Sequence, residues 1–333
     1  MQFNSLGSTG IKVSALAFGA GPISGLMTSD KHDLQCDTLR RALEAGINWI
    51  DTAATYGEGQ SEASLGHTLR ALNATDKVHI ATKVRLAEED LHNIETKIRD
   101  SVASSLERLG TSQITLLQLH NSITPHRGDQ PTSVTPDEVL GEVLSTFQKL
   151  QTEGLVAHLG LTALGEPKSL RKAINSGQFA TIQVPYNLLN PSAGTNVSID
   201  FAETDYGNII NDCNKQNMGV FAIRVFAGGA LAGQPPSQHT YKTKFFPLDL
   251  YQRDQQRVKQ LSKLLEPHAK LRKYAVRFVL SHPHITSAIV GFGAPAHIDE
   301  TLNYLSAGPL ASSEIEKLNS SNFRTVSNTT LEN

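Results

Sequence analysis

The 333-residue chain has little cysteine and no excess of charge of either sign. Its two cysteines, Cys36 and Cys213, are too few for a disulfide scaffold and lack a C-x-x-C partner, so a reducing compartment is the simpler expectation. Thirty basic residues against 32 acidic ones give a net charge of −2, which lends no electrostatic support to a nucleic-acid or anionic-membrane partner. With 39% hydrophobic residues, 25 glycines and 14 prolines, the composition excludes a disordered or collagen-like chain.

Long hydrophobic runs are also missing. The first residues, MQFNSLGSTGIK, lack the apolar segment of a signal peptide, and the uncharged run over residues 13–27 is interrupted by glycine and proline and is too short to span a bilayer. The histidines form no cluster with carboxylates at ligand spacing, so no metal site is expected. We expect a globular cytoplasmic protein without a membrane partner, and the sequence does not determine whether it has a protein partner.

What the chain does contain is a repeated alternation of short apolar runs and longer amphipathic stretches. The apolar runs cover residues 13–19, 47–53, 78–84, 114–120, 156–162, 180–186, 219–226 and 286–292. Most of them are nearly continuous in hydrophobicity, which is typical of strands that are buried on both faces.

Helix signals occupy the stretches between these runs. Residues 34–45 and 91–109 have apolar side chains at helical spacing and are followed by Gly46 and Gly110, and residues 136–153 start with Thr135 as a cap and Pro136 in the first turn. Eight strands alternating with helices predict an α/β fold, a closed (β/α)8 or TIM barrel. The competing doubly wound sheet has fewer strands and an early glycine-rich phosphate loop.

Two features depart from eight plain repeats. Residues 7–10, GSTG, lie between two apolar stretches and predict an N-terminal β-hairpin ahead of the first barrel strand. About 60 residues separate the seventh and eighth runs, which predicts a long loop after strand 7, followed by helical segments around residues 258–265 and 271–280. We assign residues 1–310 to a single barrel and residues 311–333 to a C-terminal tail with one short amphipathic piece at 315–318 and a frayed polar end.

Four polar residues fall at or near the ends of three successive predicted strands. They are Asp51, Tyr56, Lys83 and His120. In a parallel barrel the carboxyl ends of the strands meet at one face, so these side chains are expected to converge. Each residue also has an ordinary structural explanation: Asp51 as a turn residue, Tyr56 as a loop aromatic and His120 as a hydrogen-bonded core histidine. Lys83 is harder to explain in this way, because burying an unpaired amine inside an apolar strand costs free energy.

Together these groups suggest proton transfer to or from an oxygen atom. A phenol gives up its proton reluctantly near neutral pH, and a cationic lysine beside it would stabilise the phenolate, with the aspartate holding the lysine charged and in place. The histidine would hydrogen-bond the same substrate oxygen or join the proton relay. Such a site has no hydride donor of its own, so a redox reaction would need a cofactor.

The segments GINWIDTAATYGEGQSEASLG, ATK, LLQLH, GLTALG, IQVPYNLL and IVGFGAPAHIDETL, in this order, resemble the aldo-keto reductase superfamily. The resemblance extends from the N-terminal hairpin to about Leu305. It implies a (β/α)8 barrel, an NADPH or NADH cofactor across its carboxyl face, and hydride transfer from nicotinamide C4 to a carbonyl carbon. It assigns the catalytic tetrad to Asp51, Tyr56, Lys83 and His120, with Tyr56 as the general acid in reduction.

The same resemblance implies a set of cofactor-binding positions. They are Gly21, Asp51, Thr162, Gln183, Arg224, Gly291, Phe292, Gly293, His297, Glu300 and Thr301. Four of these depart from the family pattern. Thr162 replaces the usual serine of a Ser-Asn pair, and Arg224 follows a strand that commonly ends in an aromatic. His297 stands where an arginine often binds the 2′-phosphate, and Thr301 stands where asparagine is usual. We favour NADPH only weakly over NADH.

The sequence therefore predicts an NAD(P)H-dependent oxidoreductase that reduces aldehydes or ketones, with a small carbonyl compound or sugar as its substrate. One alternative is the reverse direction, an aldose dehydrogenase on the same barrel. A second is a regulatory subunit that binds the cofactor and a partner without significant turnover, although such a role would not require all four tetrad residues.

Overall fold

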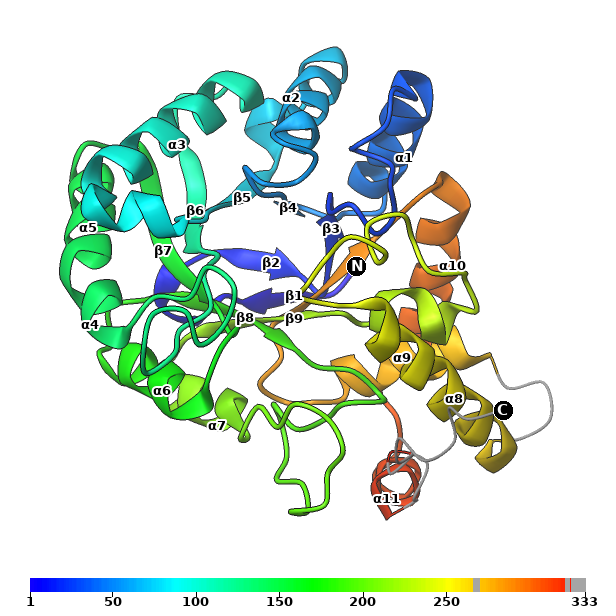
Figure 1. The fold of residues 1–333 in the computed structure, drawn as a ribbon. Helices are drawn as coiled ribbons and strands as arrows, with labels where there is room; N and C mark the ends of the chain where they lie inside the picture. The colour runs from blue at the N-terminus through cyan, green and yellow to red at the C-terminus, as the bar shows by residue number, and fades with distance from the viewer. Residues whose placement is uncertain (266–269, 321–323, 325–333) are drawn as a thin grey trace.

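A computed structural model describes residues 1–265, 270–320 and 324. Its centre is a closed barrel of eight parallel strands in the order β10-β3-β4-β5-β6-β7-β8-β9, which confirms the predicted (β/α)8 fold (Figure 1). The strands are β3 (Leu16–Gly19), β4 (Trp49–Asp51), β5 (His79–Val84), β6 (Ile114–Leu119), β7 (Val156–Thr162), β8 (Thr181–Pro185), β9 (Gly219–Ile223) and β10 (Ser287–Gly291). The register pairs Lys83 with Gln118 and Thr162 with Gln183.

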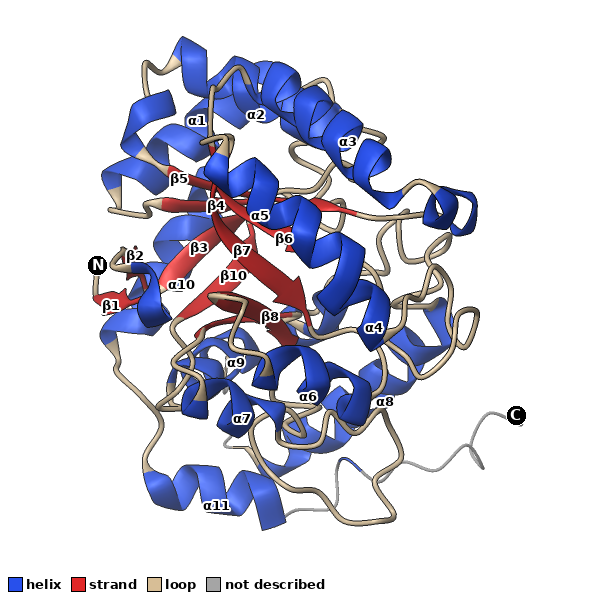
Figure 2. Cartoon of the chain, turned by 90° about the vertical axis from the view of Figure 1, so that its left-hand side faces the viewer, coloured by secondary structure: helices blue, strands red, loops and turns tan. Residues whose placement is uncertain are grey.

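Helices surround the barrel on its outer side (Figures 1 and 2). They are α1 (His32–Glu44), α2 (Gln60–Ala71), α3 (Ile94–Leu109), α4 (Pro136–Glu138), α5 (Leu144–Thr152), α6 (Pro167–Asn175), α7 (Ile209–Lys215), α8 (Leu248–Leu264), α9 (Leu271–Leu280), α10 (Pro295–Ser306) and α11 (Ser312–Ser320). One large apolar core lies between the helices and the outward-facing side chains of the strands. This arrangement explains why the strands are apolar almost throughout, because both of their faces are buried.

Side chains that point into the barrel change from apolar to polar along the strands. Near the amino ends, Trp49, Leu116 and Phe221 belong to an apolar cluster inside the barrel, and the rings of Trp49 and Phe221 lie 4.9 Å apart. Two residues further along, on the same face of their strands, lie Asp51 and Gln118. Because side chains alternate between faces with a period of two, this spacing brings polar groups together at the carboxyl face.

The predicted N-terminal hairpin is present and consists of β1 (Phe3–Ser5) and β2 (Lys12–Ser14), paired antiparallel. Its Leu6 and Val13 are buried in the same apolar cluster as Trp49, so the hairpin packs against the amino-terminal ends of the barrel strands. Gly7 has a positive φ of 51°, and a Cβ there would lie 2.3 Å from the backbone nitrogen of Gly219. Only glycine permits this close approach.

All of the apolar runs except that at residues 156–162 extend beyond the barrel strand they contain. The run at residues 13–19 is divided between the hairpin and the barrel, with Val13 in β2 and β3 starting at Leu16. The strand predicted over residues 219–226 is wrong in its last three residues, because β9 ends at Ile223. The next residue, Arg224, has a φ of 58°, which lies in the left-handed region. The strand thus ends where Arg224 enters the long connection.

Two predicted helices are less regular than their patterns indicated. The first, predicted over residues 91–109, starts at Ile94, because Asn93 has an extended φ of −153° that separates it from a short 3-10 turn. The second, over residues 136–153, contains a π-helical segment, Val139–Val143, between α4 and α5. Its capping prediction is confirmed, since Thr135 accepts a hydrogen bond from the backbone nitrogen of Glu138.

The long connection after β9 contains helices α8 and α9, close to the predicted helical segments. Beyond α10, the amphipathic piece expected at 315–318 is part of the longer helix α11, and Leu318 on it is buried. Arg324 is also buried and donates a hydrogen bond to the carbonyl oxygen of Leu188, so a frayed end is wrong at this residue. The rest of that predicted end, residues 321–323 and 325–333, lies outside the described residues. Within the described chain, no helix has the length and apolar character needed to cross a membrane.

Candidate active site

The four residues of the predicted tetrad meet at the carboxyl face of the barrel. Asp51 is the last residue of β4, Lys83 lies near the end of β5, and His120 directly follows β6. The buried Nζ of Lys83 donates to Asp51 Oδ2 at 2.7 Å, to the carbonyl oxygen of Thr52 at 2.8 Å and to Tyr56 Oη at 3.3 Å. All three protons of the ammonium group therefore have acceptors.

These contacts favour the charged form of Lys83. Burial disfavours the charge, but the negative carboxylate of Asp51 and the hydroxyl of Tyr56 outweigh it, so the pKa of Lys83 lies above its ordinary value. Asp51 also accepts hydrogen bonds from Gln118 Nε2, at 3.3 Å, and from Gln183 Nε2. The carboxylate is thus held by three donors from three other strands.

Tyr56 reaches the site through an unusual turn. The three residues after it, Gly57, Glu58 and Gly59, all have positive φ, between 56° and 93°. A Cβ at Gly57 would lie only 3.0 Å from Thr28, which adds a packing reason for glycine there. The turn leads directly into α2 and leaves the Tyr56 ring beside that of His120, with centroids 5.8 Å apart and an edge-to-face angle of 82°.

The Ser-Glu pair that follows this turn anchors α2 to the barrel. Ser61 Oγ donates to the carbonyl oxygen of Ala20 at 2.8 Å, and the fully buried Glu62 accepts hydrogen bonds from Thr82 and from Arg108 Nε. The residues of the DTAATYGEGQSE segment therefore have two tasks, namely placing Tyr56 in the site and fixing the helix behind it.

His120 is neutral at neutral pH. Burial, followed by the positive charges of Arg85 and Lys83, holds its pKa well below the ordinary value. Its Nδ1 is buried and has no hydrogen-bond partner within the described residues. A neutral imidazole can donate one hydrogen bond, so His120 can support a substrate oxygen without carrying charge.

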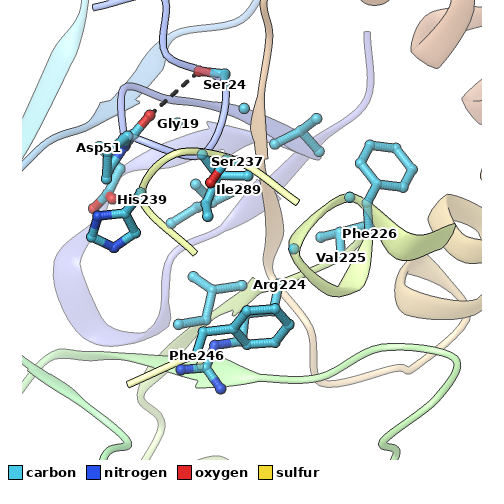
Figure 3. A pocket seen from close by; sticks show the side chains of 18 of the residues that line it. Gly19, Ser24, Asp51, Arg224, Val225, Phe226, Ser237, His239, Phe246 and Ile289 are labelled. Atoms are coloured by element: carbon cyan, nitrogen blue, oxygen red, sulfur yellow. Dashed lines mark hydrogen bonds between the residues drawn. The ribbon is translucent and has the colours of Figure 1, made fainter. Parts of the chain in front are cut away.

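A cavity of about 830 Å³ opens above these residues (Figure 3). Asp51, Tyr56 and His120 line it, whereas Lys83 lies beneath its surface. Every predicted cofactor-binding position also lines this cavity, namely Gly21, Asp51, Thr162, Gln183, Arg224, Gly291, Phe292, Gly293, His297, Glu300 and Thr301. The structure thus brings the two predicted sets of residues to one place.

Several of the predicted cofactor positions hydrogen-bond within the protein. Gln183 donates to Asp51, and Thr162 Oγ1 donates to the carbonyl oxygen of Leu119 at 3.0 Å. The backbone nitrogen of Gly293 donates to His297 Nδ1 at 3.2 Å. These bonds orient the side chains of Gln183 and Thr162 and the ring of His297.

The connection after β9 covers part of the cavity. Arg224 lies beside Phe246 (Figure 3), with its guanidinium 5.0 Å from the centre of the ring. It also donates to the carbonyl oxygen of Phe245 at 2.7 Å. The same connection contributes Ser237, His239, Lys242 and Lys244 to the lining. Positive charge is therefore concentrated on this irregular segment.

The sequence reasoning missed three polar residues of the site. Gln118 lies two residues before His120, and Arg85 lies two residues after Lys83. Because side chains two residues apart on a strand share a face, strand periodicity could have identified both. Arg272, at the start of α9, donates to Glu300 Oε2 at 2.9 Å and lines the cavity beside it. Nothing in the local sequence relates Arg272 to Glu300, which is 28 residues further along.

The cavity is suited to a nicotinamide dinucleotide by its size and its donors. Its volume lies in the upper part of the range for ligand pockets. Arg224, Lys242 and Lys244 line it, and their side chains are cations of the kind that bind phosphate oxygens. At Gly21 a Cβ would lie 3.6 Å from the Tyr56 ring and would take up space in the cavity. No cluster of histidine, cysteine and acidic residues suited to a metal ion occurs in the part of the chain that the structure describes.

Comparisons with known proteins agree with this geometry. The sequence model of the Aldo/keto reductase family matches residues 15–322. The chain is 27% identical to L-galactose dehydrogenase of Arabidopsis thaliana, over 91% of this chain and 87% of that protein. It is also 27% identical to D-threo-aldose 1-dehydrogenase of a Pseudomonas species, over 89% and 91%. The holo form of an aldo-keto reductase from Bacillus halodurans has the same fold, with a TM-score of 0.72 at 21% identity over 96% and 95%.

Proposed function

Because this chain belongs to the aldo/keto reductase family and is an oxidoreductase acting on carbonyl or CH–OH groups, we propose that it reduces aldehydes or ketones with Tyr56 as the general acid. The observation that carries this proposal is the contact of Lys83 Nζ with both Asp51 and Tyr56 Oη. The family uses nicotinamide cofactors, and a bound nicotinamide supplies the hydride that the chain itself cannot provide.

The protein's own contribution is to deliver a proton to the substrate oxygen. When Tyr56 Oη gives up its proton, negative charge develops on that oxygen, and the ammonium group of Lys83, 3.3 Å away, stabilises it. The neutral His120 donates a hydrogen bond to the same substrate oxygen and adds no competing charge. Asp51 keeps Lys83 charged and in position.

The predicted cofactor positions divide into two groups. We assign Thr162, Gln183 and Gly21, which lie near the tetrad, to the nicotinamide end, and Arg224 to the phosphates. Residues 291–293, His297, Glu300 and Thr301 form the adenosine end. Arg272 lines this end as well, and its guanidinium supports our proposal that NADPH binds slightly better than NADH.

Oxidation of a sugar on the same site is the second candidate. Two relatives that match most of the chain are named as an L-galactose dehydrogenase and a D-threo-aldose 1-dehydrogenase. In that direction Tyr56 would accept the proton of a hydroxyl group, with Lys83 stabilising the phenolate that receives it. The residues and their roles are the same in both directions.

Replacing Tyr56 with phenylalanine tests the proposal. We expect kcat to fall by roughly 10²- to 10⁴-fold while the Kd for NADPH is retained, because the phenolic proton is used only in the chemical step. The measurement follows NADPH and NADH absorbance with a panel of aldehydes, ketones and aldoses, and cofactor binding by fluorescence quenching.

Tyr241→Phe provides the control, since Tyr241 is exposed and does not line the cavity. A near-normal kcat in Tyr56→Phe would show that another group delivers the proton. Retained cofactor binding without turnover of any substrate by the wild type would instead favour a cofactor-binding regulatory role.

A further inference from the structure

Arg85 is a cation in the cavity that the proposed chemistry does not use. It follows β5, two residues after Lys83, is partly buried and lines the cavity. Its Nε donates to the carbonyl oxygen of His120 at 3.2 Å, and its guanidinium lies 4.4 Å from the centre of the Phe245 ring. Burial of the guanidinium lowers the pKa of Arg85 below its ordinary value.

These contacts leave the donor edge of the guanidinium unused. The Phe245 ring covers one face of the group, and Nε is the only nitrogen with an acceptor among the residues that the structure describes. No described carboxylate forms an ion pair with Arg85. The two Nη groups therefore form a planar fork of donors, the geometry that binds carboxylate and phosphate oxygens in pairs.

The acidic residues of the cavity cannot neutralise this charge. Among the residues that the structure describes, Asp51 and Glu300 are the only acidic ones that line it. Each is already paired, Asp51 with Lys83 at 2.7 Å and Glu300 with Arg272 at 2.9 Å. An uncompensated, partly desolvated cation in a cavity is most stable when an anion from outside binds to it.

The position of Arg85 in the barrel indicates which ligand provides that anion. In the closed strand order, β5 lies opposite β9, whose end carries Arg224, the residue we assign to the cofactor phosphates. The neighbours of β5 are β4 and β6, which contribute Asp51 and His120. The guanidinium also bonds to the backbone of His120 itself. Arg85 contacts the ring of Phe245, whose carbonyl oxygen accepts a hydrogen bond from Arg224. Because the hydrogen bond of Arg85 itself goes to His120, Arg85 lies on the side of Phe245 where the reacting carbonyl must contact Tyr56 and His120.

We propose that Arg85 binds an anionic group of the substrate, so that the preferred substrates are carbonyl compounds, or the corresponding alcohols, that carry a carboxylate or a phosphate. This inference rests on the proposed function and narrows its substrate class. The guanidinium edge holds the anionic group while the carbonyl oxygen of the same molecule contacts Tyr56 Oη. A neutral aldehyde of equal length would lack this contact.

Matched pairs of substrates test the proposal. Succinic semialdehyde is compared with butanal for the carboxylate, and glyceraldehyde 3-phosphate with glyceraldehyde for the phosphate. In the wild type we expect kcat/KM to be at least about 10-fold higher for the charged member of at least one pair, mainly through KM. The pair with the larger ratio identifies which anion the site prefers.

Substitution of Arg85 then assigns the preference to this residue. In Arg85→Gln the charged-to-neutral ratio of kcat/KM should fall by roughly 10- to 100-fold, whereas Arg85→Lys should retain part of it. Loss of the Arg85 charge also affects His120, but this effect acts equally on the charged and the neutral substrate and therefore cancels in the ratio of their kcat/KM values. Arg127→Gln is the control, because Arg127 is an arginine on the loop after β6 that pairs with Glu138 and does not line the cavity. It should leave the ratio unchanged.

Equal ratios in the wild type and Arg85→Gln would overturn the proposal while leaving carbonyl reduction intact. Absence of turnover with every substrate would refute the proposed function instead. In that case, calorimetric titration with butanoate and butanamide, at saturating NADP⁺, decides the anion site separately. The anion site is supported if the wild type binds butanoate but not butanamide and Arg85→Gln binds neither. It is overturned if the wild type binds the two ligands equally, or if the wild type and Arg85→Gln bind butanoate equally.

Discussion

At the scale of single residues, the charges in the cavity depend on one another. Lys83 stays charged because Asp51 and Tyr56 outweigh its burial, and Lys83 and Arg85 in turn help to keep His120 neutral. Glu300 and Arg272 form a second ion pair, at the end of the cavity that we assign to adenosine. Changing one of these groups therefore alters the protonation or the contacts of its neighbours.

We propose that one such residue, Arg272, sets the choice between NADPH and NADH. Arg272→Gln is expected to shift the ratio of the Kd values for NADPH and NADH by about fivefold toward NADH, or about 1 kcal/mol, as is reasonable for a partly exposed cation. Fluorescence quenching with both cofactors measures this ratio without turnover. Arg41→Gln is the matched control. Arg41 pairs with Asp299, which lies on α10 next to Glu300, the partner of Arg272, but Arg41 does not line the cavity. An unchanged ratio in Arg272→Gln would exclude Arg272 as the 2′-phosphate partner.

At the scale of elements, the hairpin and the catalytic face lie at opposite ends of the barrel. The hairpin packs on Trp49 and Phe221 at the amino ends of the strands, while Asp51, Lys83 and His120 lie at the carboxyl ends. In barrels of this type the amino-terminal face contributes to stability and the carboxyl-terminal face to chemistry. The two can therefore be perturbed separately.

Leu6→Ala tests this separation. Leu6 has no exposed surface, and its loss should lower the free energy of unfolding by about 2–5 kcal/mol because a cavity is left in the cluster. Denaturant unfolding measures the loss, and kcat and cofactor Kd should remain close to wild type below the unfolding transition. Phe3→Ala, on the same hairpin but 46% exposed, should cost much less. A fall in kcat without loss of stability in Leu6→Ala would show that the hairpin affects the site directly.

At the scale of the whole molecule, the free energy of unfolding depends on pH through buried histidines. The pKa of His120 lies well below its ordinary value in the folded protein, while in the unfolded chain it titrates near 6.5. Below about pH 6.5 the unfolded chain gains a proton that the folded protein does not accept. Stability contributed by the neutral His120 is therefore present above this pH and is lost as the pH falls.

His120→Gln removes this contribution. Between pH 6.5 and 5.5 the free energy of unfolding of the wild type should fall by about 1 kcal/mol more than that of the variant. Urea unfolding at the two pH values gives the difference, and effects of the other histidines cancel because both proteins contain them. Thr162→Val, a change in the same cavity that does not titrate, should show the wild-type loss. Equal losses in the wild type and His120→Gln would mean that His120 takes up a proton in the folded state.

Much of the site could be predicted because it depends on short-range patterns. The eight apolar runs and the period of two within strands place Asp51, Lys83 and His120 at one face of a barrel, and the turn after Tyr56 contains two glycines, one on each side of Glu58. Gln118 and Arg85 obey the same periodicity and could have been added. The division into a barrel over residues 1–310 and a tail over 311–333 remains a prediction.

The sequence by itself determined the barrel and the four converging polar residues, because strand periodicity and chain order are local properties. Only the tertiary structure decided that Gln183 bonds to Asp51, that Arg272 pairs with Glu300 and that Arg85 stacks on Phe245. These partners are brought together by closure of the barrel and by the path of an irregular connection across its mouth, which has no periodicity to read. Within the described part of the chain, these contacts leave Arg85 without an acidic partner, and we propose that a substrate anion completes its site.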